Sequence, residues 1–138
     1  MAGYSGTPLV RKLGIRPDER IVALQPPPHY ETLLDGLPAG VALTNRVFAG
    51  ATFVHLFVTE RVRFEKQLAL LREKLADAGV VWVSWPKKSA GVPTDITEDT
   101  IRAVALPLGF VDVKVCAVDE TWSALKLMIR KENRGKRA

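Results

Sequence analysis

Apolar positions along this sequence fall first into short, nearly continuous runs. Three of these runs have the length of a β-strand and are apolar on both faces: Ile21–Leu24, Phe53–Val58 and Val80–Trp85. A strand that is apolar on both faces is typical of a parallel sheet covered by helices on each side. A weaker run, Gly40–Asn45, predicts one further strand after the first.

Segments of helical periodicity separate these runs. Apolar residues recur at intervals of four, three and four positions within residues 60–78, so one stripe of this helix faces a core. Thr97, which two carboxylates follow, is typical of a helix start and predicts a second helix that ends at Pro107–Gly109. Thr59 is predicted to cap the helix over residues 60–78, and Gly79 to end it. Shorter helices are predicted over residues 8–13, with Gly14 as a left-handed stop, and over residues 29–37.

The last third of the chain alternates between apolar and polar residues. Phe110–Val118 and Trp122–Arg130 both alternate, and Asp119–Thr121 joins them tightly, which predicts an antiparallel hairpin with one wetter face. Together these elements predict an α/β fold. We expect a three-layer, Rossmann-like arrangement with a mostly parallel sheet of about six strands that ends in the hairpin.

The length fits a single domain, and the positive charge is concentrated at one end. We interpret residues 1–130 as one α/β domain, in which residues 1–19 form an N-terminal arm with a short helix, and residues 131–138 as a basic tail. The formal net charge is +5, but five of the 20 basic residues lie in the last nine positions. Nucleic acid could therefore bind only through this tail, and a solvated terminus explains the same charge.

The remaining composition bears on the cellular compartment. The single cysteine, Cys116, cannot form an internal disulfide, and no apolar run approaches the length of a membrane span. The first residues lack the apolar stretch of a secretory signal. We therefore expect a bacterial, cytoplasmic protein that does not contact a membrane.

The run L-G-I-R-P-D-E-R-I-V-A-L (Leu13–Leu24) resembles the entry to the first strand of S-adenosylmethionine-dependent methyltransferases. The order of elements over roughly residues 9–130 is similar to theirs as well. The resemblance implies a methyltransferase-like strand order. Because only seven residues separate Asn45 from Phe53, it also implies that one strand–helix unit of that fold is missing.

Three motifs give a second resemblance, to a small bacterial family of uncharacterised domains. They are G-Y-S-G (Gly3–Gly6), V-S-W-P-K-K (Val83–Lys88) and V-C-A-V-D-E-T-W (Val115–Trp122). This resemblance implies no particular activity.

The methyltransferase resemblance weakens at the cofactor contacts. The loop after the first strand of that family needs glycines for a close backbone approach, whereas Gln25–His29 contains three prolines, which have no N–H to donate. The acidic residue expected after the second strand is replaced by Thr44 and Asn45. We therefore expect a degenerate relative that binds no cofactor.

Open α/β sheets bind ligands beyond the carboxyl ends of their strands. The side chains that we expect there form the candidate ligand site: Gln25, His29, Tyr30, Thr59, Trp85, Lys87, Lys88, Ser89 and Thr94. Adjacent lysines suit an anionic group, although a solvated loop accounts for them too. The candidate catalytic residues are His29, Glu60 and Asp95.

Other residues with chemical potential have simpler explanations. His55 lies in the middle of an apolar strand, which indicates a hydrogen-bonded core histidine rather than a ligand. Two histidines and one cysteine without ligand spacing predict no metal site. The polar turn Asp119–Thr121 is explained by solvation.

These observations favour a non-catalytic α/β module, rather than an active methyltransferase, that binds a small anionic ligand or a protein partner at the strand ends. The alternative is an enzyme of unassigned type, a degenerate transferase, that uses the same cleft. Nucleic-acid association through the tail is a third hypothesis. A homodimer would cover the sheet edge that the missing unit leaves open.

Overall fold

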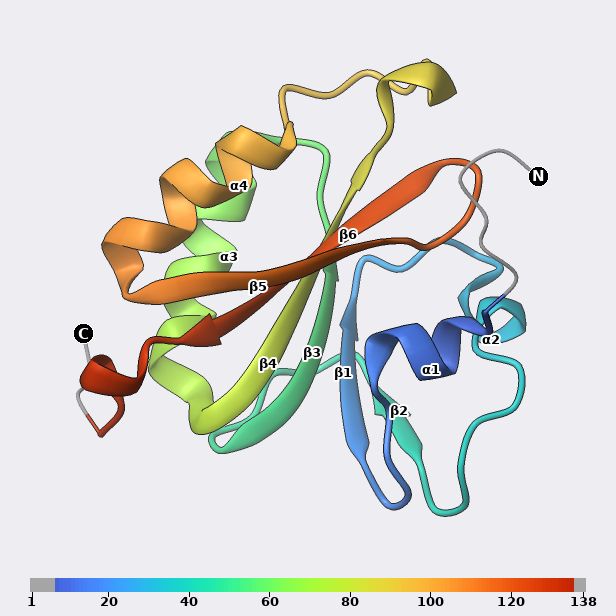
Figure 1. The fold of residues 1–138 in the computed structure, drawn as a ribbon, viewed down its shortest axis with the longest axis horizontal. Coiled ribbons are helices and arrows are strands. Elements are labelled where there is room, and N and C mark those ends of the chain that lie inside the picture. Colours follow the sequence, from blue (N-terminus) through green and yellow to red (C-terminus); the bar gives the residue numbers. More distant parts are fainter. Residues whose placement is uncertain (1–6, 136–138) are drawn as a thin grey trace.

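Six strands form one sheet in the order β2-β1-β3-β4-β6-β5 (Figure 1). This computed structural model describes residues 7–135 of the chain. The strands are β1 (Arg20–Leu24), β2 (Ala42–Thr44), β3 (Ala51–Phe57), β4 (Leu75–Pro86), β5 (Phe110–Ala117) and β6 (Trp122–Ile129). Strands β1 to β4 run parallel, β6 is antiparallel to β4, and β5 is antiparallel to β6. The predicted mixed α/β fold with an antiparallel end is confirmed.

Helices cover both faces of the sheet. They are α1 (Leu9–Leu13), α2 (Tyr30–Leu33), α3 (Arg61–Lys74) and α4 (Glu98–Ala105), with 3₁₀ turns η1 (Lys88–Ala90), η2 (Leu106–Leu108) and η3 (Lys131–Asn133). Helices α3 and α4 lie on one face, and the short α1 and α2 lie on the other (Figure 1). Within the described residues, no helix is long and apolar enough to cross a membrane.

Each face of the sheet has its own hydrophobic core. Beneath α3 and α4, Leu56, Val83 and Leu125 from three neighbouring strands are buried together with Phe64 and Leu68. Each such side chain contributes roughly 1.5–3 kcal/mol by leaving water. The alternation of β3 and β4 places their other side chains in the second core.

The second core lies beneath α1 and α2. Phe53 and Trp82 are buried there against Leu13 of α1. The Trp82 indole N–H donates to the Leu13 carbonyl at 3.0 Å, so the largest side chain of this core also satisfies its polar atom. Gly14 ends α1 in the left-handed conformation (φ 74°), as its place after the apolar run predicted.

Helix α3 is shorter than its apolar periodicity predicts. It ends at Lys74, and Leu75 already belongs to β4, where it pairs with Ala51. Gly79 lies inside this strand: a Cβ there would come within 2.9 Å of the Leu75 side chain and 3.0 Å of the Ala51 carbonyl oxygen. The prediction that Gly79 ends the helix is wrong, because this glycine permits a close approach between strands instead.

The amino end of α3 is capped by a distant residue. Thr59 was expected to cap this helix, but Glu60 occupies the N-cap position and its side chain makes no cap hydrogen bond. Instead, Asp95 Oδ1 accepts a hydrogen bond from the Arg61 N–H at 2.7 Å. Asp95 therefore joins the loop before α4 to the start of α3.

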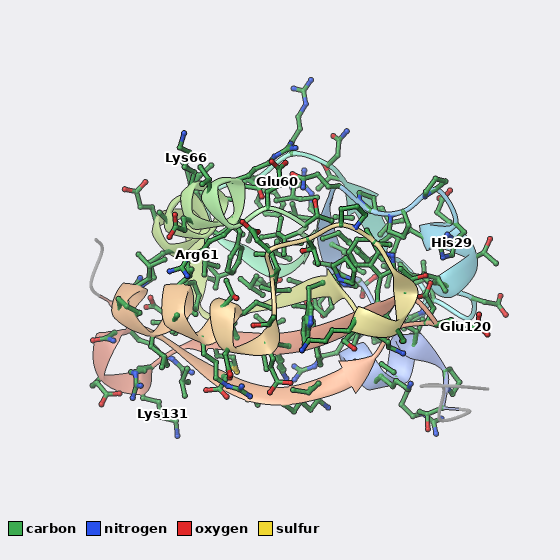
Figure 2. All side chains as sticks on the ribbon, turned by 90° about the horizontal axis from the view of Figure 1, so that it is seen from above. His29, Glu60, Arg61, Lys66, Glu120 and Lys131 are labelled. Atoms are coloured by element: carbon green, nitrogen blue, oxygen red, sulfur yellow. The ribbon has the colours of Figure 1, made fainter. Side chains whose placement is uncertain are left out.

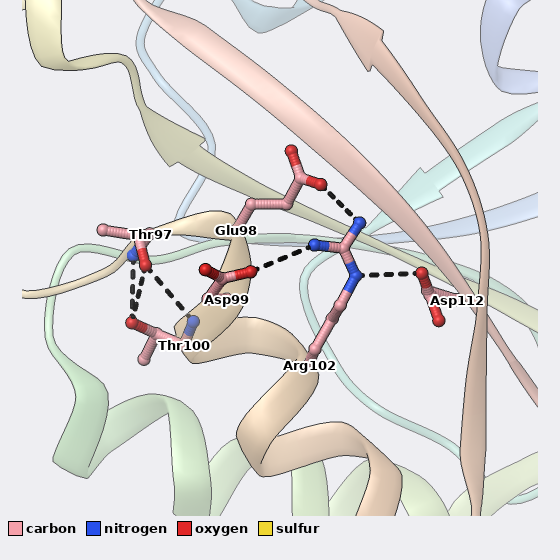
Figure 3. A network of polar contacts seen from close by, with 6 residues as sticks. All are labelled: Thr97, Glu98, Asp99, Thr100, Arg102 and Asp112. Atoms are coloured by element: carbon pink, nitrogen blue, oxygen red, sulfur yellow. Dashed lines mark hydrogen bonds and ion pairs between the residues drawn. The ribbon is translucent and has the colours of Figure 1, made fainter.

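Helix α4 carries the cap that its sequence predicts. The Thr97 hydroxyl accepts from the Thr100 N–H at 3.3 Å, and the Thr100 hydroxyl accepts from the Thr97 N–H at 3.1 Å (Figure 3). The two carboxylates of the first turn favour the positive end of the helix dipole.

Arg102 connects α4 to the edge strand β5. Its Nε donates to Asp112 Oδ2 at 2.9 Å, while its terminal nitrogens pair with Glu98 and Asp99 of its own helix (Figure 3). The hydrogen bond from Arg102 holds the pKa of Asp112 below its usual value, and this outweighs the opposing effect of desolvation.

Part of the basic segment 131–138 packs against the domain. Asn133 donates its side-chain amide to the Gly109 carbonyl at 3.3 Å, and its own carbonyl accepts from Arg72 at 3.3 Å. The Gly135 N–H donates to Asp77 at 3.0 Å. The G-Y-S-G motif, Gly3–Gly6, lies outside the described residues.

Candidate functional site

The carboxyl ends of β1, β3 and β4 lie at one edge of the sheet because these strands run parallel. The turn between β5 and β6 lies at the same edge, since Trp122 at the start of β6 pairs with Pro86 at the end of β4. After β1 the chain forms β2 on one side, and then β3 on the other. Such a reversal of strand order is where open α/β sheets bind ligands.

A histidine and a carboxylate meet at this edge from opposite ends of the sequence. His29, in the loop after β1, places its Nε2 2.9 Å from Asp119 Oδ2, in the β5–β6 turn. The His29 side chain is 51% exposed and that of Asp119 is 17% exposed. A bound molecule can therefore reach the imidazole, while the carboxylate behind it is largely covered.

Hydrogen bonds fix the Asp119 carboxylate in place. Its second oxygen, Oδ1, accepts from the N–H groups of Thr121 and Trp122 at 2.9 and 2.8 Å. Burial would raise the pKa of Asp119, but the hydrogen bonds from His29 and from these two N–H groups outweigh burial and lower it. Asp119 is therefore ionised at neutral pH and orients the His29 ring.

Lys87 holds the β5–β6 turn against the end of β4. Its Nζ donates to the Asp119 carbonyl oxygen at 2.8 Å, and its backbone N–H donates to the Thr121 carbonyl at 2.8 Å. The structure thus brings together two of the predicted site residues, His29 and Lys87, around Asp119. The sequence analysis assigned Asp119 to a solvated turn, and the only signal for its role was the density of polar residues there.

One pocket at this edge lies between the ends of β1 and β2. It has a volume of about 560 Å³ and is lined on one side by Pro26, Pro27 and Pro28 and on the other by Thr44 and Asn45. This volume is in the range of small-molecule sites. The walls are apolar on the proline side and carry hydroxyl and amide groups on the β2 side.

Tyr30 forms part of this pocket but directs its hydroxyl into the core. Tyr30 Oη lies 2.8 Å from His55 Nδ1, and His55 Nε2 lies 2.7 Å from Ser84 Oγ. All three residues are buried. Burial lowers the pKa of His55 to about 3 and raises that of Tyr30, so both stay neutral. The prediction that His55 is a hydrogen-bonded core histidine is confirmed.

Gln25 and Thr59 make hydrogen bonds that hold the loops in place where the strand order reverses. Gln25 has a positive φ of 56° and donates its side-chain amide to the Phe57 carbonyl at 2.9 Å, and its own side-chain oxygen accepts from Gln67. The cavity beside these side chains has a volume of about 20 Å³, which is room for one water molecule. The Thr59 carbonyl accepts from the Thr94 hydroxyl at 2.7 Å.

The three candidate catalytic residues do not meet. Glu60 lies at the start of α3, well apart from His29 when the edge is viewed from above (Figure 2). Asp95 is engaged in capping α3. Of the three, His29 is the one that the structure pairs with an orienting carboxylate.

A second groove runs between η1 and the start of α4. It has a volume of about 700 Å³, and the predicted site residues that line it are Trp85, Lys87, Lys88 and Thr94. Ser89 lies within the adjoining η1 turn. The carboxylate residues Glu98 and Asp99 line the opposite wall, so the groove carries both signs of charge rather than a purely cationic surface.

Possible metal ligands and the single cysteine were compared with the geometry of the described residues. Within residues 7–135, no group of three His, Cys, Asp or Glu side chains is arranged to hold a metal ion. Cys116 is half-buried and unoxidised. Burial raises the pKa of its thiol and outweighs the opposing charges of Lys12 and Lys114, which makes it a poor nucleophile.

Comparison with known proteins connects this fold to a class of solved enzyme structures. No family model and no curated protein sequence matches the chain. Among solved structures, it is similar to one described as a pericyclic reaction enzyme, with a TM-score of 0.55 and 12% identity. The alignment covers 88% of this chain and 39% of that one, so the chain spans about two fifths of the length of its structural neighbour.

Two further similar structures carry the name of a protein. They are LepI in complex with S-adenosylmethionine (SAM), and a cysteine variant of LepI in complex with S-adenosylhomocysteine (SAH) and a substrate analogue. Both align with a TM-score of 0.55 and 12% identity, over 88% of this chain and 39% of LepI. At this identity the likeness establishes the fold.

These comparisons contradict the main functional prediction. The chain was expected to be a non-catalytic binding module, whereas the solved structures that share its fold include a pericyclic reaction enzyme and complexes of LepI with SAM and with SAH and a substrate analogue. They favour the alternative, an enzyme that uses the cleft at the strand ends. The prediction failed because it treated the missing glycines and acidic residue as evidence against catalysis in general.

Proposed function

We propose that this chain is an enzyme that transfers a proton to or from a small molecule at the carboxyl edge of its sheet. The observation that supports it most strongly is the 2.9 Å contact between the exposed His29 ring and the covered Asp119 carboxylate. A histidine oriented by a carboxylate is the usual form of a general acid–base group.

The contact determines which nitrogen of His29 would act. An ionised carboxylate can only accept, so Nε2 carries the hydrogen that faces Asp119 and Nδ1 has the lone pair. In the proposed reaction Nδ1 takes a proton from the substrate, and the Asp119 carboxylate stabilises the imidazolium that forms. Lys87, whose Nζ lies 2.8 Å from the Asp119 carbonyl, adds positive charge where an anionic intermediate would develop.

The strand order is compatible with a shortened form of the methyltransferase fold. We propose that the order β2-β1-β3-β4-β6-β5 is the Rossmann-like, methyltransferase-like order from which one strand–helix unit is missing. Only the residues between Thr44 and Ala51 join β2 to β3, and β2 is an edge strand of three residues. This is the place where the sequence predicts the deletion.

The pocket between β1 and β2 would bind the substrate. Its proline loop and the end of β2 do not match an S-adenosylmethionine site, and the carboxylate that lines it, Glu31, comes from α2 instead. Its volume of about 560 Å³ is sufficient for a nucleoside. However, Pro26, Pro27 and Pro28 provide no N–H donors, and Thr44 and Asn45 provide no carboxylate for ribose hydroxyls. The proposed proton transfer accordingly involves His29 and Asp119 and no step through that cofactor.

The experiment is to incubate the purified protein with a metabolite extract and to follow, by mass spectrometry, which masses disappear and which appear. Wild-type protein should convert at least one compound. His29→Gln should lower that rate at least 100-fold, in line with the contribution of general acid–base catalysis. Glu120→Gln, which changes the neighbouring carboxylate of the same turn, should leave the rate unchanged.

Two results would refute the proposal. Either wild-type protein converts nothing, or His29→Gln converts the same compounds at the wild-type rate. A parallel calorimetric titration with S-adenosylmethionine and S-adenosylhomocysteine tests the pocket. Binding that disappears in Asn45→Leu would show that the pocket accepts an adenosyl group despite its prolines.

A further inference from the structure

Two lysines face each other on the edge strand β5 and its neighbour β6, on the side of the sheet covered by α1. Lys114 of β5 is paired directly with Lys126 of β6. A bulge between Asp112 and Lys114 shifts the register of β5. Asp112 therefore faces α4, whereas Lys114 lies over the Trp82 ring at 5.9 Å from its centroid. Like charges directly opposite each other on an antiparallel pair are destabilising, so this arrangement calls for an explanation.

Further positive charge lies beside this pair. Arg16, from the loop after α1, lines the same groove as Lys126. Lys12 of α1 donates its Nζ to the Ala117 carbonyl at 3.0 Å, at the end of β5. We call Arg16, Lys114 and Lys126 the cationic cluster. Among residues 7–135, no carboxylate forms an ion pair with any of its three members.

The groove next to the cluster is lined by polar, small and larger apolar residues. It has a volume of about 290 Å³, and the residues on its walls include Gly14, Thr52 and Gly79. Glu19 is the acidic residue among the described ones that line it, and its carboxylate accepts from the Thr52 hydroxyl at 3.2 Å. The groove lies toward the amino ends of the strands, at the opposite edge from His29 and Asp119.

We infer that the cationic cluster and this groove bind the phosphate group of a small phosphorylated ligand. A phosphate offers several strong acceptor oxygens and up to two negative charges, so one group can neutralise Lys114 and Lys126 together. The groove takes the phosphate-bearing end of the ligand, with Arg16 on its rim. This site is separate from the proposed acid–base site and does not depend on it.

The surroundings favour a small ligand over a nucleic-acid strand. Trp82, the aromatic ring beneath the lysines, is completely buried and offers no face on which a base could stack. Single-strand binding surfaces combine backbone contacts with exposed aromatic rings. Here the charges surround a groove of limited volume instead.

The pKa of Lys126 offers a second way to detect an anion at this site. Burial lowers the pKa of Lys126, and the charges of Lys114 and Arg16 lower it further. A bound phosphate would oppose the two charge effects. Binding should therefore raise this pKa, which gives a second readout at the same residue.

The experiment is a calorimetric titration of the whole chain with inorganic pyrophosphate in 50 mM NaCl, followed by NMR spectra of the lysine side chains. We expect saturable binding at one site, weakened at least tenfold by Lys126→Met and by Lys114→Gln. The control is Lys66→Gln, which removes an exposed lysine of α3 (Figure 2) and should leave the affinity unchanged. Lys126→Met removes a repulsive pair, so loss of folding should not confuse the result.

Three outcomes would overturn the inference. The first is the absence of saturable binding, and the second is an equal loss of affinity in Lys126→Met and Lys66→Gln. The third is binding of a 20-nucleotide single-stranded DNA that requires Lys126 and that pyrophosphate does not displace, because a nucleic-acid backbone would then be the ligand.

Discussion

Lowering the pH from 7.5 to 5.0 should destabilise this protein through His55. The ring is completely buried between Tyr30 and Ser84, and burial lowers its pKa to about 3. In the unfolded chain the same ring takes up a proton near its ordinary pKa of about 6.5. Between these two values the unfolded state binds one more proton than the native state, so stability falls as the pH falls.

The magnitude follows from the two pKa values. Stability changes by about 1.4 kcal/mol per pH unit once the pH is below 6.5, which gives a loss of about 2 kcal/mol between pH 7.5 and 5.0. Unfolded carboxylates, with pKa values of about 4, remain mostly ionised in this interval and contribute little. Proton uptake by imidazole therefore dominates over uptake by carboxylates in this window.

Urea unfolding at both pH values, followed by tryptophan fluorescence, measures the effect. His55→Gln should be less stable at pH 7.5 by about 1–3 kcal/mol, because buried hydrogen bonds are lost, but its stability should hardly change with pH. Val62→Ala, which changes an exposed residue of α3 that cannot titrate, is the control and should keep the slope of the wild type. A wild-type change below about 0.5 kcal/mol, or an equal slope in His55→Gln, would refute the reasoning.

Three further changes test the fold. Asp95→Ala should lower the free energy of unfolding by about 1 kcal/mol because the cap of α3 is lost. Asp35→Ala, at an exposed position, should not lower it, and equal urea midpoints for the two variants would contradict the prediction. Gly79→Ala should lower the free energy of unfolding by about 1–3 kcal/mol, since the new Cβ would lie 2.9 Å from the Leu75 side chain. An unchanged melting temperature would show that the backbone can move to make room for it. Lys126→Met should raise stability by about 0.5 kcal/mol at low salt and less in 1 M NaCl, and a destabilised variant would mean that the lysine pair is not repulsive.

The sequence was sufficient for the elements whose signal is local. Runs such as Phe53–Val58 are apolar on both faces because each face of β3 meets its own core, and this requirement is visible in every residue of the run except His55. The alternation after Phe110 likewise predicts the hairpin. Boundaries fail where a distant partner decides them: Leu75 continues the apolar stripe of α3, but its pairing with Ala51 draws it into β4.

Only one of the two residues of the acid–base site could be predicted from the sequence. His29 could be selected because it follows a strand end, but its partner Asp119 is 90 positions away, and no periodicity connects the two. Asp95 was selected for its chemistry, whereas the contact with Arg61, 34 positions away, gives it a structural task. Sequence patterns indicate which residues are buried in a core, but they do not indicate which polar side chains meet across the sheet.

The last strand of the chain lies inside the sheet, between β4 and β5. During synthesis β4 is therefore made more than thirty residues before its neighbour β6, and it presents an open edge of apolar residues throughout that time. Neither the β4–β6 ladder nor the turn that carries Asp119 can form until the segment through Ile129 has left the ribosome. Ribosome-bound chains that stop short of this residue should consequently associate with one another or with chaperones, and should lack the His29 site altogether.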